Sequence, residues 1–268
     1  MSELPAGRAD TPAWHGGSFG AFATCVLAPN AGPMTLDGTN TWILRGSSSG
    51  RSVVVDPGPL HAGHLAAVGA RAGDIAAVLL THGHADHAEA ARALAEQAGC
   101  GVRALDPAHR LGSEGLGGGD VVAIDDLDVR VVATPGHTSD SLSFVLPDRC
   151  VLTGDTVLGR GTTVVAHPDG RLGAYLDSLE RLRDLAERGE VTRVLPGHGP
   201  VLEDAAGVLG EYLAHRGRRL DQVREAVGSG LTTPRSVVER VYADVDPALW
   251  PAAELSVAAQ LEYLRSGG

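Results

Sequence analysis

Lysine is absent from this sequence, so all 22 basic residues are arginine, and they are outnumbered by 33 acidic residues. The formal net charge of −11 argues against a broad polyanion-binding surface, because nucleic-acid-binding proteins normally present a basic face. No apolar run approaches the roughly 18 residues that a membrane-spanning helix needs. Residues 1–11 mix charges, proline and glycine, which is not typical of a secretion signal. We therefore expect a soluble, cytoplasmic protein with no membrane contact.

Cysteine is scarce as well, and two common nucleotide-binding motifs are missing. The three cysteines, Cys25, Cys100 and Cys150, are odd in number, widely spaced and set among apolar residues. This usage is typical of small buried side chains in a reducing compartment, so we expect no disulfide partner for them. The sequence also contains no P-loop and no dinucleotide-binding glycine pattern.

What the sequence does contain is a dense group of potential metal ligands after the apolar run 76–80. The segment Thr81-His82-Gly83-His84-Ala85-Asp86-His87 places three imidazoles and one carboxylate within six residues. Zinc and similar ions prefer imidazole nitrogen with some carboxylate oxygen, and a catalytic site leaves one position open to water. The segment therefore predicts a metal-dependent hydrolase. A helix capping box formed by Asp86 and Glu89 is the alternative, but it leaves the histidines unexplained.

The same local pattern, an apolar strand followed by glycine and a potential ligand, occurs four times. The four pairs are Gly83-His84, Gly136-His137, Gly154-Asp155 and Gly197-His198. Glycine permits a sharp turn at a strand end, where a rigid sheet can aim several side chains at one point. Two ligand sets result, bridged by Asp155: His82, His84 and His137 in the first, and Asp86, His87 and His198 in the second. Together they suffice for two metal ions roughly 3.5 to 4 Å apart with a nucleophilic hydroxide between them.

Two carboxylates of these sets are assigned catalytic roles, and a third carboxylate is left open. We expect Asp155 to join the two metal ions and Asp86 to hold or relay the proton of the attacking water. Asp56 follows the predicted strand 53–55, where it either supports the metal ligands or caps a turn. The expected cofactors are two Zn²⁺ ions per chain, with Mn²⁺ or Fe²⁺ as alternatives.

Strand and helix patterns alternate up to residue 204, and only helix patterns follow. Residues 1–20 are expected to be irregular. Strands are predicted at 22–27, 41–44, 53–55, 75–80, 101–105, 121–124, 129–133, 142–146, 150–152 and 191–195. Helices are predicted at 62–70, 86–99, 174–188 and 205–227, and Thr233-Pro234 and Asp246-Pro247 each open a further helix. We therefore divide the chain into a domain of residues 1–204 and a helical domain of residues 205–268.

The ligand order resembles the five-motif signature of the metallo-β-lactamase superfamily over about residues 20–200. The matching residues, in order, are Asp56, His82, His84, Asp86, His87, His137, Asp155 and His198. The resemblance implies an α+β fold, a four-layer αββα sandwich with a binuclear zinc site at one edge of two packed sheets.

Longer matches narrow the resemblance to the lactamase-beta-like protein 2 group, which is related to glyoxalase II. The matching segments are 38–42, 135–138, 154–163 and 196–200. That group includes an endoribonuclease acting on single-stranded RNA, and fungal polyketide thioesterases are also similar. The resemblance implies that the C-terminal helices form a small winged-helix-like domain with a short or absent wing. Ser141 stands where many relatives carry a histidine.

The substrate class is open at this stage. The group resemblance favours a phosphodiester in single-stranded RNA slightly, whereas the acidic composition favours a thioester of the glyoxalase II or acyl-carrier type. A β-lactam is less favoured, and a nucleic-acid-binding protein with structural zinc is the non-enzymatic alternative. Substrate contacts are expected from Asn40, Arg160, Thr162 and Thr163. The segment 215–219 either binds phosphate or, as we prefer, forms an exposed helix face, and a homodimer is left open.

Overall fold

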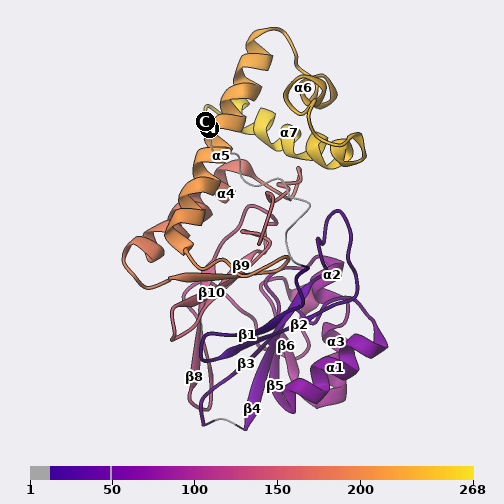
Figure 1. Ribbon diagram of the computed structural model, residues 1–268, viewed down its shortest axis with the longest axis vertical. Helices are drawn as coiled ribbons and strands as arrows, with labels where there is room; N and C mark the ends of the chain where they lie inside the picture. Colours follow the sequence, from indigo (N-terminus) through magenta and orange to yellow (C-terminus); the bar gives the residue numbers. More distant parts are fainter. Residues whose placement is uncertain (1–12, 49) are drawn as a thin grey trace.

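The computed structural model describes residues 13–48 and 50–268, and the structural statements below refer to these residues. Two β-sheets pack face to face, helices cover the outer face of each sheet, and a group of helices extends from one end (Figure 1). The six-stranded sheet has the order β1-β2-β3-β4-β5-β6, and the five-stranded sheet has the order β11-β10-β9-β8-β7. The expected α+β fold with four αββα layers is therefore confirmed.

The strands of the first sheet are β1 (Gly17–Phe19), β2 (Ala23–Leu27), β3 (Asn40–Arg45), β4 (Arg51–Val55), β5 (Asp74–Leu79) and β6 (Gly101–Arg103). Those of the second are β7 (Val121–Ile124), β8 (Leu127–Ala133), β9 (Leu142–Val145), β10 (Cys150–Gly154) and β11 (Arg193–Pro196). The pairs β4–β5, β5–β6 and β10–β11 are parallel, and the other neighbours are antiparallel. Parallel neighbours end at the same edge, which brings their following loops together.

The helices are α1 (Ala62–Ala72), α2 (Ala85–Ala88), α3 (Ala91–Ala98), α4 (Leu172–Glu187), α5 (Ala205–Gly228), α6 (Pro234–Val241) and α7 (Trp250–Arg265). Two short 3-10 helices lie at Pro107–His109 and Pro247–Leu249. Helix α6 begins as expected, because the Thr233 side chain accepts a hydrogen bond from the backbone of Ser236. Asp246 caps the 3-10 helix instead, so α7 starts only at Trp250.

The central strands β3, β4, β9 and β10 are buried almost throughout because both faces of each sheet are covered there, whereas the edge strand β7 alternates exposed and buried residues. Alternate residues of β3 show this: Trp42 and Leu44 face the core between the sheets, while Ile43 faces the helices α1 and α3. Phe144 of β9 enters the inter-sheet core from the second sheet and is fully buried. Burial of one such side chain contributes about 1.5 to 3 kcal/mol, so the inter-sheet core contributes strongly to the stability of the sandwich.

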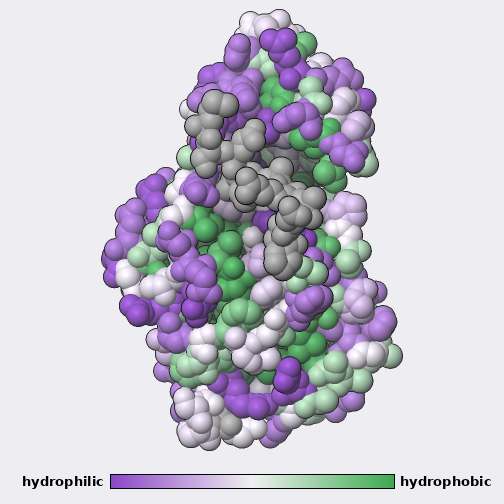
Figure 2. All heavy atoms as spheres, in the orientation of Figure 1, coloured by the Kyte–Doolittle hydropathy of each residue, from purple (hydrophilic) through white to green (hydrophobic). Residues whose placement is uncertain are grey.

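The layered arrangement also explains the burial of the cysteines and the distribution of polar side chains on the surface. Cys25 and Cys150 are buried in the inter-sheet core, Cys100 is half-buried, and all three are free thiols. Figure 2 shows hydrophilic side chains along both flanks of the sandwich, with apolar ones gathered down its middle, where Figure 1 shows β1 and β9. No helix in the described part of the chain is long and apolar enough to cross a membrane.

Helix α5 contributes buried side chains to two separate hydrophobic cores. Its first half packs with α4 on the outer face of the second sheet, through Leu209 and Tyr212. Its second half joins α6 and α7 in a separate small core, through Val223 and Ala226. The position of a domain boundary at residues 204 and 205 stays a prediction, and no strand follows β11 in the described chain.

Two expectations about local structure, and the capping-box alternative, were wrong. The predicted helix 86–99 is divided into α2 and α3, because the backbone N–H of Ala90 donates to Gly58 O, in the loop after β4. Asp86 and Glu89 form no capping box, since the Glu89 carboxylate accepts a hydrogen bond from Leu60 N instead. Residues 1–20 are not wholly irregular, because β1 pairs with β2, although residues 1–12 lie outside the described part.

We predict that Gly136→Ala lowers the free energy of unfolding by roughly 2 to 4 kcal/mol. Gly136 has φ of +138°, and an added Cβ would lie 2.4 Å from the backbone nitrogen of Tyr175, which is closer than real Cβ contacts. Urea denaturation measures the change. The matched control is Gly210→Ala inside α5, where no atom lies within 4 Å and a gain of about 0.5 to 1 kcal/mol is expected. Equal stability of the two variants would contradict the close packing at Gly136.

Candidate metal centre

Five loops meet at one end of the sandwich and carry all the expected ligands. Asp56 follows β4, the segment 82–87 follows β5, His137 follows β8, Asp155 follows β10, and His198 follows β11. Each loop leaves a strand that is held by hydrogen bonds within a buried sheet, so the loop origins are fixed relative to each other.

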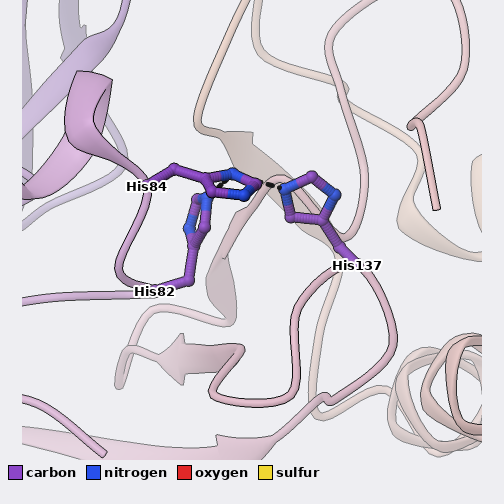
Figure 3. A group of neighbouring side chains, drawn as sticks. All are labelled: His82, His84 and His137. Atoms are coloured by element: carbon purple, nitrogen blue, oxygen red, sulfur yellow. Dashed lines mark hydrogen bonds between the residues drawn. The ribbon is translucent and has the colours of Figure 1, made fainter. Parts of the chain in front are cut away.

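His82, His84 and His137 form the first group, and Figure 3 shows their rings pointing toward one another. His84 Nδ1 lies 3.0 Å from His82 Nε2 and 3.1 Å from His137 Nε2. One ligand atom from each side chain lies within 4.8 Å of the others. Such spacing allows a single ion to contact all three nitrogens.

Asp86, His87 and His198 form the second group beside it. His198 Nε2 lies 3.2 Å from both His87 Nε2 and Asp86 Oδ2. Asp155 stands between the groups: its Oδ1 is 3.4 Å from His87 Nε2, and its Oδ2 is 3.7 Å from His137 Nε2. The structure thus brings together all seven side chains of the two sets expected from the sequence.

The chemistry of this donor set fits divalent metal ions. In the first group imidazole nitrogens face each other at hydrogen-bond distance, and a neutral ring has only one N–H to share. The Asp155 Oδ1 atom is buried and has no hydrogen-bond partner among the described residues. Buried lone pairs without enough protons between them are costly unless a cation occupies the space. We infer that the seven side chains are the ligands of the centre.

Charges inside the cluster are unevenly distributed over the imidazoles. Burial opposes protonation of His198, but Asp155 and the hydrogen bonds to Asp155 and Asp86 raise the pKa of His198 to about 9. The pKa of His87 is also raised well above its ordinary value, because Asp155 and Asp56 outweigh the effect of burial. Without a metal ion, these two imidazoles therefore carry the positive charge that balances the carboxylates.

The remaining members of the cluster shift in the opposite direction. Burial, with the nearby imidazoles, lowers the pKa values of His82 and His137, so these rings are neutral and ready to bind a metal ion. Burial raises the pKa of Asp155, but His198 and His87 hold it well below its usual range. Asp155 is therefore ionised at neutral pH.

Hydrogen bonds behind the ligands fix which ring nitrogen faces the centre. His87 Nδ1 lies 2.8 Å from Asp56 Oδ2, and His137 Nδ1 lies 2.8 Å from Val164 O. His198 Nδ1 lies 3.1 Å from the carbonyl of Gly38. These contacts leave Nε2 of each ring pointing inward. Of the two roles left open for Asp56, the contact with His87 favours support of the metal ligands over turn capping.

One expected substrate contact is corrected by the structure. Asn40 is fully buried, and its Nδ2 donates to the carbonyls of Pro196 and Gly199 at 2.9 and 2.8 Å. Its Oδ1 accepts a hydrogen bond from Trp14. The amide therefore has no free group for a substrate, and Asn40 braces the loop that carries His198.

The other residues expected to contact the substrate lie near the cluster, and they differ in the partners that their side chains already have. Arg160 lines a cavity next to the cluster and is paired with Asp37, 2.5 Å away. Thr162 lines the same cavity, whereas the buried Thr163 hydroxyl donates to the backbone carbonyl of Asp155 at 2.7 Å. Ser141 is buried too, and its hydroxyl lies 2.7 Å from that of Thr138, so it stabilises the turn rather than facing the cavity.

The cavity has a volume of about 330 Å³ and is formed by both parts of the chain. It begins at His137 and Asp155 and extends to Tyr242 and to α7, with α5 contributing His215, Arg216 and Arg219. Arg216 is only 8% exposed, so the exposed-face interpretation of residues 215–219 was wrong for this residue. The sequence signal was weak, because a basic run on a helix usually faces water and its burial depends on how α5 meets the sandwich.

Comparisons with known proteins agree with this architecture and confirm the family resemblance. Residues 34–198 match the metallo-beta-lactamase superfamily, and residues 233–268 match the beta-lactamase associated winged helix domain. A Beta-lactamase-like protein 2 homolog of Caenorhabditis elegans is 31% identical, and the match covers 91% of this chain and 84% of the relative. An atrochrysone carboxyl ACP thioesterase of Aspergillus chevalieri is 34% identical, with 82% of this chain and 73% of the relative covered.

A solved structure supports the fold independently of close sequence similarity. The crystal structure of a beta-lactamase domain protein from Burkholderia ambifaria has a TM-score of 0.81 and is 24% identical, covering 97% of this chain and 91% of that chain. Family membership itself follows from the domain match and from the relative with 31% identity over most of the chain. The chain therefore belongs to the metallo-beta-lactamase superfamily, whose members are metal-dependent hydrolases.

Proposed function

We propose that this protein is a binuclear metallo-hydrolase that cleaves a thioester bearing an apolar acyl group. The observation that carries this proposal is the cavity at the cluster, because its wall between the two parts of the chain is mostly apolar. The wall includes Leu36 and Leu158 from the sandwich and Leu249, Ala252 and Ala253 from the C-terminal helices. An apolar acyl chain gains free energy by leaving water for such a wall, whereas a polar nucleotide does not.

The chemistry assigned to the centre is hydrolysis, in which water and a thioester yield a carboxylic acid and a thiol. Two divalent ions, zinc with manganese or iron as alternatives, would be held by the seven side chains. When bound, such ions acidify water and act as a Lewis acid toward the attacked oxygen. The C–S bond breaks as a C–O bond forms.

Asp86 is the chain's own candidate for moving the proton of the attacking water. Its carboxylate is 30% exposed at the cluster, and its Oδ2 lies 3.2 Å from His198 Nε2. Burial raises the pKa of Asp86, but the hydrogen bond to His198 and the His87 charge hold it below the ordinary value. An ionised carboxylate in this place can accept the proton at Oδ2 and release it toward the departing thiolate.

A phosphodiester in single-stranded RNA is the second candidate. It is favoured by Arg219 and the Tyr242 ring, which both line the cavity, with the guanidinium carbon 4.4 Å from the ring centre. An aromatic face can stack on a base, and a guanidinium can bind phosphate. The apolar wall and the net charge of −11 make this candidate the weaker one.

We predict that Asp155→Ala and His84→Ala each abolish metal-dependent turnover. Asp155 would bridge both ions, and His84 is the nitrogen shared by the two closest contacts of the first group. Metal content by plasma mass spectrometry is expected to fall from two ions per purified wild-type chain. His15→Ala is the control, because His15 is exposed and outside the cluster. Full activity of either cluster variant would contradict the ligand assignment.

We also predict that metal binding releases protons in a pH-dependent way. The raised pKa of His198, about 9, means that its ring is protonated at pH 7.5 in the metal-free protein. A metal ion must displace that proton, and nothing remains to be displaced from this ring once the pH exceeds its pKa. Calorimetry in buffers of different ionisation enthalpy is expected to show about one proton fewer released at pH 10 than at pH 7.5. A release that does not change with pH argues against the assigned charge state.

A substrate panel separates the two candidates. We expect the zinc-loaded protein to hydrolyse a hexanoyl thioester of N-acetylcysteamine with a kcat/KM at least about tenfold above that of the acetyl thioester, because the longer chain reaches the apolar wall. Leu249→Ser is expected to reduce this preference, and Asp155→Ala is the inactive control. Cleavage of single-stranded RNA without thioester turnover would replace the first candidate by the second, and turnover of neither substrate would overturn both.

A further inference from the structure

Arg216 is a buried guanidinium in the wall of the cavity, with little to balance its charge. The side chain comes from α5, is 8% exposed, and donates one hydrogen bond to the carbonyl of Thr163. Its guanidinium carbon lies 4.9 Å from the centre of the Tyr175 ring. Within the described part of the chain, the buried Nε has no hydrogen-bond partner, and Arg216 takes part in no ion pair. One carbonyl and one ring face satisfy only part of a cation with five N–H groups.

A purely structural role does not account for this arrangement. Holding the Thr163 segment requires a hydrogen-bond donor, not a positive charge, and a buried charge without a carboxylate is costly. Arg160, in the same cavity, shows the usual solution, because Asp37 neutralises it. Asp155 is the only acidic residue among the described residues that line the cavity, and it faces the imidazole cluster. The positive charge of Arg216 is therefore not neutralised by the described residues that line the cavity, and an anionic ligand could neutralise it.

Two neighbouring side chains on α5 add one positive charge and one hydrogen-bonding group beside Arg216. Arg219, three residues further along α5, also lines the cavity, and within the described residues it donates hydrogen bonds to Val241 O and Gln222. His215 has a buried Nδ1 without a partner. Burial and the adjacent arginines lower the pKa of His215 to about 4, so this ring is neutral at pH 7 and offers a hydrogen bond rather than a charge.

We propose that Arg216, supported by Arg219 and His215, binds an anionic group, a carboxylate or a phosphate, that the substrate carries beside its apolar part. The site is close to the reacting bond, because Thr163 joins Arg216 to the backbone of Asp155 through two successive hydrogen bonds. The inference rests on the proposed hydrolysis for the identity of that bond. It narrows the preferred substrate to amphipathic anions, and a thioester that carries such an anion is then a better substrate than a neutral one.

Matched ligands test the anion site without requiring hydrolysis. Succinate, glutarate and adipate are compared by calorimetry with monocarboxylates of equal length, using the metal-loaded protein. A first carboxylate can bind the metal ions in either series, so only the second carboxylate reports on Arg216. Wild type is expected to bind at least one dicarboxylate about 10- to 100-fold more tightly than its matched monocarboxylate, the range typical of a charged hydrogen bond. Equal affinity in all pairs would overturn the proposal.

Variants assign the preference to one side chain. Arg216→Gln is expected to remove the dicarboxylate preference, and Arg216→Lys, which keeps the charge but loses the planar fork, to retain part of it. Arg224→Gln is the control, because Arg224 lies on α5 but is exposed and paired with Asp221. An Arg216→Gln protein that folds and keeps the full preference would contradict the assignment. If the Arg216→Gln protein does not fold, the dicarboxylate preference of the wild type and its partial retention in the Arg216→Lys protein still test whether Arg216 binds the anion.

Turnover rates of charged and neutral thioesters then show whether the anionic group of the substrate belongs to the acyl part or to the thiol part. Three thioesters are compared: hexanoyl-N-acetylcysteamine, which is neutral, adipoyl-N-acetylcysteamine, with the charge on the acyl part, and hexanoyl-mercaptopropionate, with the charge on the thiol. We expect Arg216→Gln to raise KM for one charged thioester about 10- to 100-fold more than for the neutral one. An equal loss on all three would indicate a structural role and overturn the proposal. Dicarboxylate binding without any thioester turnover would instead sink the proposed hydrolysis and leave the anion site standing.

Discussion

The Asp56 carboxylate makes the interaction on which the arrangement of the site depends. It accepts hydrogen bonds from Thr81 N at 2.8 Å and Thr81 Oγ1 at 2.6 Å, and its Oδ2 lies 2.8 Å from His87 Nδ1. These contacts join the end of β4 to the end of β5 and to the first turn of α2. Because Asp56 is buried, water does not compete for them, and the ring of His87 is held with Nε2 toward the centre.

The second constraint is the way α5 connects the two parts of the chain. Leu209 and Tyr212 fix its first half on the sandwich, while Val223 and Ala226 fix its second half in the C-terminal core. Arg216 lies between these anchors, which is why a basic residue of a long helix becomes buried beside the metal centre. In the proposed function, the C-terminal helices therefore contact the substrate, and the sandwich carries the metal ligands.

The ligand set could be proposed from the sequence because its spacing follows from local chemistry. A glycine at a strand end followed by an imidazole or a carboxylate marks His84, His137 and Asp155, and the structure brings these side chains into one cluster, while their binding of metal ions stays a prediction. Tertiary contacts decided what the sequence could not: the hydrogen bond from Ala90 to Gly58 divides the helix after the motif. The burial of Arg216 and the use of Asn40 as a brace likewise depend on segments far away in the chain.

The central claim is that seven side chains from four strand-end loops hold two metal ions on either side of Asp155. Anomalous diffraction from crystals of the zinc-loaded protein, recorded at the zinc absorption edge, measures this directly. The account predicts two peaks per chain, one among His82, His84 and His137 and one among Asp86, His87 and His198. A single peak, or a strong peak at a site away from these residues, would contradict it.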